Sequence, residues 1–74
     1  MLELTAAQRL ALIDRRTSKG YDRGDSEFML DRILDHSEAY GRADTIRVLV
    51  YEAFATTKQA EALCADLPKG VFEK

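Results

Sequence analysis

The last third of the chain decides the fold, and residues 44–68 read DTIRVLVYEAFATTKQAEALCADLP. Apolar residues recur in this stretch at the spacing of one helical face. They are Ile46, Leu49, Val50, Ala53, Ala60, Leu63, Cys64 and Leu67. Residues 46–51 also have strong β character, but the chain offers no second strand to pair with them. We therefore expect a helix from Asp44, a good capping residue, to Leu67, just before the helix-breaking Pro68.

One signal within this stretch opposes a continuous helix. Thr56 is followed three residues later by Gln59, which is the pattern of a capping box at the start of a helix. A break near Ala55–Thr57 would give four helices instead of three. The sequence thus predicts an all-α fold, a small bundle of three helices, or of four if the last one breaks.

The first predicted helix covers residues 6–17. Thr5 and Gln8 form a capping-box pattern before it, and Gly20 ends it. Helical spacing predicts a core stripe on this helix. Its members are Ala6, Leu10, Ile13 and Thr17. Leu12 falls outside this stripe, among arginines.

The second predicted helix covers residues 26–40, after a cap at Asp25 or Ser26. Gly41 is a natural residue to end it. The predicted core side has five members, Met29, Leu30, Ile33, Ser37 and Tyr40. His36 borders this side, and Phe28 lies outside it at the start of the helix.

With 74 residues, we interpret residues 1–74 as one helical domain with a tail over 68–74. The stability of a domain this small is marginal unless a disulfide, a bound metal, close helix packing or a second subunit adds to it. A single cysteine forms no disulfide within the chain, and one Cys with one His cannot supply the four ligands of a closed zinc site. We expect no metal and no cofactor. A second copy of the chain is another way to bury apolar surface.

A second apolar side of the third predicted helix supplies a candidate dimer seam. It consists of Val48, Tyr51, Ala55 and Ala62. The alanines would let two backbones approach closely. This side either packs against a second neighbour within the bundle or joins two copies of the chain; we predict a homodimer formed through this helix.

The charges are divided along the chain although the net charge is only −2. Residues 9–23 are mainly basic and residues 25–44 mainly acidic, a division that can orient a partner. Repeated like charges on one helix face are unfavourable, so the acidic side of the second helix is either a docking surface for a basic partner or an ordinary solvated face. The predicted partner-binding residues are Leu12, Phe28, Asp31, Asp35 and Glu38.

Catalysis does not fit the residues present. Cys64 falls on the predicted core face and His36 on a core margin, so we interpret both as buried structural residues. The many carboxylates lie on a convex helix surface without a cleft to shift their pKa values. We expect no catalytic residue and no enzyme activity.

The expected location is the cytoplasm. The N-terminal stretch does not resemble a signal peptide, and no apolar run approaches the roughly 20 residues that span a bilayer. A lone thiol fits a reducing compartment. We therefore expect no membrane association.

These observations predict a small non-enzymatic regulatory or adaptor protein. It would act by binding a protein surface, as an inhibitor or interaction module, and as a homodimer. The alternative is a DNA-associated regulator, in which a helical dimer contacts phosphates through a basic cluster. That cluster is Arg15, Arg16, Lys19 and Arg23. The mild net charge makes nucleic acid the less favoured partner.

Overall fold

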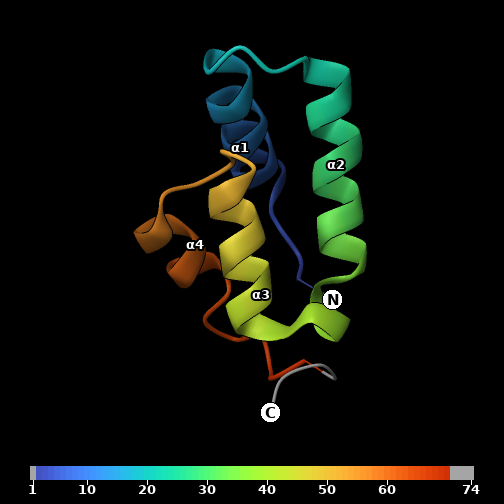
Figure 1. Ribbon diagram of the computed structural model, residues 1–74, viewed down its shortest axis with the longest axis vertical. Coiled ribbons are helices and arrows are strands. Elements are labelled where there is room, and N and C mark those ends of the chain that lie inside the picture. Colours follow the sequence, from blue (N-terminus) through green and yellow to red (C-terminus); the bar gives the residue numbers. More distant parts are fainter. Residues whose placement is uncertain (1, 71–74) are drawn as a thin grey trace.

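The computed structural model describes residues 2–70, and this part of the chain forms four helices. They are α1 (Ala6–Ser18), α2 (Arg23–Asp35), α3 (Ser37–Tyr51) and α4 (Thr57–Leu63). Each helix packs against the next in chain order, α1 on α2, α2 on α3 and α3 on α4 (Figure 1). The predicted all-α fold is confirmed, in its four-helix form.

The start and end of α1 follow the predicted signals. The backbone N–H of Gln8 donates to Thr5 Oγ1 at 3.1 Å, and the N–H of Thr5 donates to Gln8 Oε1 at 2.9 Å. Gly20 has a φ of 99° and donates its N–H to the carbonyl oxygen of Thr17. This left-handed conformation ends the helix at little cost only for a residue without a Cβ.

The core face of α1 differs from the prediction. Its buried residues are Leu12, Ile13 and Arg16, whereas Leu10 is 49% exposed. The predicted stripe through Leu10 was wrong because it assumed that arginines face solvent. The buried guanidinium of Arg16 has partners on neighbouring segments, so this charged side of α1 faces inward.

The second predicted helix is displaced. It begins three residues earlier because Asp22, and not Asp25 or Ser26, caps it through a 2.9 Å hydrogen bond from the N–H of Asp25 to Asp22 Oδ2. It ends at Asp35, and the chain turns at His36 into α3. The predicted end at residue 40 was therefore wrong.

Gly41 lies in a kink inside α3 and does not end α2. Its φ of 80° and ψ of 178° belong to a region that essentially only glycine adopts. The segment that follows α4 packs against this kink. Gly41 forms an isolated bridge with Lys69, and the N–H of Arg42 donates to the carbonyl oxygen of Pro68 at 3.1 Å. The kink thus anchors the first residues of the predicted tail, whose residues 71–74 lie outside the described part.

The helix predicted over residues 44–67 differs at both ends, because α3 begins at Ser37 and stops at Tyr51. The N–H of Phe54 donates to the carbonyl oxygen of Leu49 at 2.9 Å, and that of Ala53 to Val50 at 3.1 Å. These two bonds form a Schellman motif, with Ala53 in the left-handed position at a φ of 65°. Thr56 then caps α4 with the predicted capping box.

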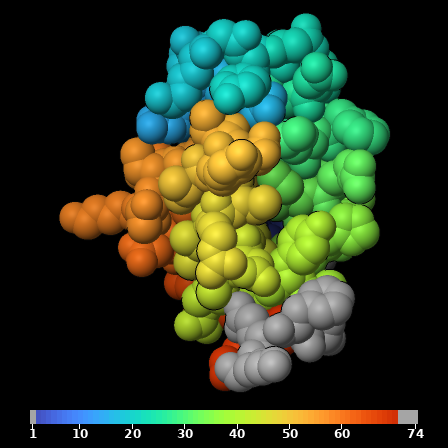
Figure 2. Space-filling model, in the orientation of Figure 1, coloured from blue at the N-terminus to red at the C-terminus, as the bar shows by residue number. Residues whose placement is uncertain are grey.

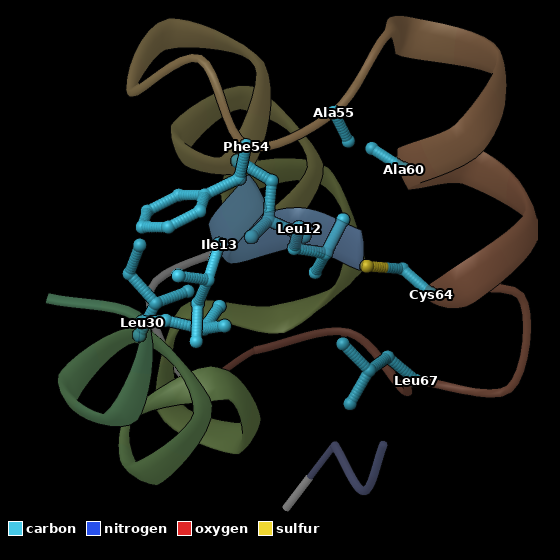
Figure 3. Packing of buried hydrophobic residues seen from close by; sticks show 10 residues of the cluster. Leu12, Ile13, Leu30, Phe54, Ala55, Ala60, Cys64 and Leu67 are labelled. Atoms are coloured by element: carbon cyan, nitrogen blue, oxygen red, sulfur yellow. The ribbon is translucent and has the colours of Figure 1, made fainter. Parts of the chain in front are cut away.

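The break lets the linker enter the core. Phe54 is fully buried, and Ala55 faces Ala60 of α4 (Figure 3). Ten apolar residues form the buried cluster: Leu12, Ile13, Leu30, Ile33, Leu49, Phe54, Ala55, Ala60, Cys64 and Leu67. Burying a residue as large as Phe54 contributes about 1.5–3 kcal/mol. This contribution helps to explain why the chain leaves the helix after Tyr51.

Candidate functional site

A hollow of about 380 Å³ lies between α2 and α3, and Figure 2 shows it between the green atoms of α2 and the yellow atoms of α3. A neighbouring hollow of about 330 Å³ shares Tyr40 and Val48 with it and extends to Tyr51. We call the two together the α2–α3 groove. Its main apolar lining is Phe28, Met29, Ile33, Tyr40, Val48 and Tyr51.

Two large rings at this groove are exposed to solvent. Phe28 on α2 is 66% exposed, and Tyr51 at the end of α3 is 82% exposed. Single exposed apolar residues are common on protein surfaces, but here the two rings border adjoining hollows, Phe28 the larger one and Tyr51 the smaller one. Aromatic side chains of this kind are enriched in protein contact sites.

Arg16 supports the groove from beneath and is only 4% exposed. Its Nε donates to the carbonyl oxygen of Glu52 at 2.8 Å, its Nη2 lies 3.2 Å from Glu52 Oε1, and its Nη1 donates to Ser26 Oγ at 2.9 Å. The guanidinium also lies 4.1 Å from the ring centre of Tyr21 and 5.1 Å from that of Phe54. The buried charge is thereby compensated, and α1, α2 and the end of α3 are held together.

The rim of the groove carries opposite charges at different positions along α2. Asp22 and Asp25 border it at the beginning of the helix, and Arg32 borders it two turns later. The guanidinium of Arg32 lies 5.9 Å from the ring centre of Phe28. The groove therefore has an acidic and a basic end with an aromatic ring between them.

The predicted partner-binding residues do not form one surface. Leu12 is only 6% exposed, so its assignment to a contact surface was wrong. Phe28 is exposed at the groove. Asp31 pairs with Arg9 at 3.1 Å and lies with Asp35 in a separate hollow on the α1 side of α2. Glu38 belongs to α3, because α2 ends at Asp35, and so the predicted acidic stripe is interrupted.

The predicted dimer seam is also divided. Val48 and Tyr51 lie on α3, Ala55 is buried in the linker and Ala62 lies on α4. A single seam required one unbroken helix, and the Schellman motif after Tyr51 removes it. Val48 and Tyr51 remain together, but at the α2–α3 groove.

The basic cluster proposed for DNA contacts is not a free patch. Arg16 is buried among its own partners, and Arg23 pairs with Asp14 at 2.9 Å. Of the four residues, only Lys19 is both exposed and outside the ion pairs of residues 2–70, since Arg15 is half-buried.

The two candidate reactive residues, Cys64 and His36, differ in burial. Cys64 is fully buried, as predicted, and burial raises the pKa of its thiol above the ordinary 9.0, against a smaller opposing effect of the Arg42 charge. His36 is exposed, so its predicted burial was wrong; its ring lies 5.8 Å from that of Tyr40. Within residues 2–70, no three His, Cys, Asp or Glu side chains are grouped as a metal ion would require.

Comparisons with known proteins add no function: the chain matches no family model, no curated protein and no solved structure. Over the described residues, none of the helices has the length and apolar character needed to cross a membrane.

Sequence reasoning missed most of the groove because Met29, Ile33, Tyr40 and Val48 fit a core face or a dimer seam equally well. It also missed the burial of Arg16, for which the spacing of this residue from Leu12 and Ile13 on one side of α1 was the available signal.

Proposed function

We propose that this chain is a small non-enzymatic regulatory or adaptor protein that binds a protein surface through the α2–α3 groove. The observation that carries this proposal is the exposure of Phe28 and Tyr51, one at each of the two adjoining hollows that form the groove. Withdrawing such rings from water is favourable by about 25 cal/mol per Å² of apolar surface. A protein that contributes apolar side chains to the groove would therefore gain affinity there.

The supporting network favours a preformed site. The Arg16 hydrogen bonds fix the end of α3 relative to α1 and α2, so the walls of the groove do not have to be ordered on binding. Preorganisation of this kind lowers the entropic cost of association. We place this activity in the cytoplasm, because a buried free thiol such as Cys64 suits a reducing compartment.

The proposal is tested by comparing proteins captured on three immobilised forms of the chain. The forms are the wild type, Phe28→Ser and Leu10→Ser. Leu10 is a matched control because it is also a large exposed apolar residue, at 49%, but lies on α1 away from the groove. Specific partners should bind to the wild type and Leu10→Ser and be lost with Phe28→Ser. Capture that is the same for all three forms would contradict a role for the groove.

A further inference from the structure

Two opposite charges at the rim of the groove, those of Asp25 and Arg32, would complement the same two charges on a second copy of the chain. Asp25 and Arg32 are seven residues apart on α2, which places them about 10 Å apart along the axis and within about 20° of the same direction. Phe28 lies between them. Both charged side chains are exposed, and neither forms an ion pair within residues 2–70.

We propose that a second copy of this chain occupies the α2–α3 groove, with the two α2 helices antiparallel across a two-fold axis near Phe28 and Met29. In such an interface the same patch serves both copies, so each contact occurs twice. Asp25 of each copy then lies opposite Arg32 of the other. The charges that are separated along one helix become two reciprocal ion pairs.

The apolar part of the groove suits the same arrangement. Phe28 stands beside its own groove and is mostly exposed, and a two-fold axis next to it directs each ring toward the groove of the other copy. Met29 and Ile33 already line that groove, and a thioether packs favourably against an aromatic ring. Each copy thus provides the ring and the site that receives it.

This dimer replaces the one predicted from the sequence, whose seam included the buried Ala55. It rests on the proposed function, because it uses the same groove, and it adds a form of regulation. A foreign partner and a second copy would compete for Phe28 and its surroundings. The chain would be inactive as a dimer and would bind its partner as a monomer.

Charge-reversed variants provide a sharp test, because the ion pairs are reciprocal. In a dimer of Asp25→Arg, arginines face each other twice, and in a dimer of Arg32→Asp, aspartates face each other twice. Juxtaposed like charges are costly at an interface, so each variant should dimerise at least about tenfold more weakly than the wild type. A mixed dimer has one copy of each variant, and in it both pairs are again of opposite charge.

Sedimentation velocity at micromolar to millimolar concentrations is the measurement, and circular dichroism checks that each variant keeps its helices. We expect the wild type to dimerise, each variant alone to be monomeric, and their equimolar mixture to dimerise. Glu61→Arg is the control, because it changes net charge as Asp25→Arg does but lies on α4; it should dimerise as the wild type does.

Three outcomes would overturn the inference. These are a wild type that stays monomeric throughout, dimerisation unaffected by either reversal, and a mixture that fails to associate. Failure here is distinguishable from failure of the proposed function. If the wild type is monomeric but still captures partners through Phe28, only the proposed dimer is refuted. If it dimerises but captures no partner that depends on Phe28, only the proposed binding of a different protein is refuted.

Discussion

Arg16 Nε lies 2.8 Å from the backbone carbonyl oxygen of Glu52, and this hydrogen bond joins α1 to the residue that follows the last turn of α3. Arg16 is the one charged side chain buried within the described residues. Its contacts connect three segments that are distant in sequence and form the support of the α2–α3 groove. The fold and the candidate site therefore depend on the same side chain.

Replacing Arg16 should be costly. In Arg16→Met an unbranched apolar stem is kept, but Ser26 and Glu52 lose their charged donor. Removing one partner of a buried charge network is strongly destabilising, and the 25% exposure of Glu52 lets water compensate part of the loss. We expect the free energy of unfolding in urea to fall by about 2–3 kcal/mol.

The control is Arg23→Met, whose pair with Asp14 is exposed and should contribute less than about 1 kcal/mol. Equal losses for the two variants would contradict a structural role for Arg16.

Replacing Ala53 with glycine should stabilise the protein. Its φ of 65° puts a Cβ in the left-handed region that ends α3, where glycine has no steric penalty. Ala53→Gly should raise the free energy of unfolding by about 0.5–1 kcal/mol, whereas Ala53→Val should lower it. Thermal unfolding of the three proteins checks this order. A less stable glycine variant would show that the Schellman motif is not what ends the helix.

Gly41 should tolerate no side chain. Its φ and ψ lie in a region accessible essentially to glycine alone, so Gly41→Ala should cost about 1–3 kcal/mol in the free energy of unfolding. Gly24→Ala is the matched control, because Gly24 lies in the first turn of α2 without a positive φ. A Cβ there would lie 3.2 Å from Asp22 Oδ2, a contact that a small shift of this exposed side chain relieves, so alanine at this position should cost less than about 1 kcal/mol. Similar effects at both glycines would argue against the kink.

The buried thiol of Cys64 should make the free energy of unfolding fall as the pH becomes alkaline. Burial raises the pKa of its thiol above 9.0, so on raising the pH the unfolded chain loses this proton before the folded one does. Between the two pKa values the folded state binds more protons, and its stability therefore falls as pH rises. As the pH rises above the ordinary thiol pKa of 9.0, the free energy of unfolding should decline more steeply in the wild type than in Cys64→Ala. Parallel curves would place the thiol in contact with solvent.

Local signals predicted the starts of α1 and α4 but not that of α2, whose cap is Asp22. The capping boxes at Thr5–Gln8 and Thr56–Gln59 are both present, because each satisfies backbone donors within four residues. The helix ends were predicted less well. Ala53 is a good helix former and carries no stop signal, yet the burial of Phe54 and Ala55 favours a break there. That gain arises from tertiary packing, which no local pattern contains.

The site was predicted only in part for a related reason. Phe28 was identified because it falls outside a core stripe, but Tyr40 and Val48 satisfy helical periodicity whether they face a core or an open groove. Leu12 was misplaced because the burial of Arg16 depends on Glu52, 36 residues away in sequence. Only the packed structure brings these residues together.

The central claim is that the α2–α3 groove is a protein contact surface, and site-specific photo-crosslinking tests it most directly. A photoreactive amino acid is placed at Phe28, at Tyr51 or, as the control, at Leu10, each in an otherwise unchanged chain. Positions 28 and 51 should crosslink to the same protein, either a foreign partner or a second copy, and position 10 should not. Absence of crosslinks at positions 28 and 51, or equal crosslinking at position 10, would contradict the account.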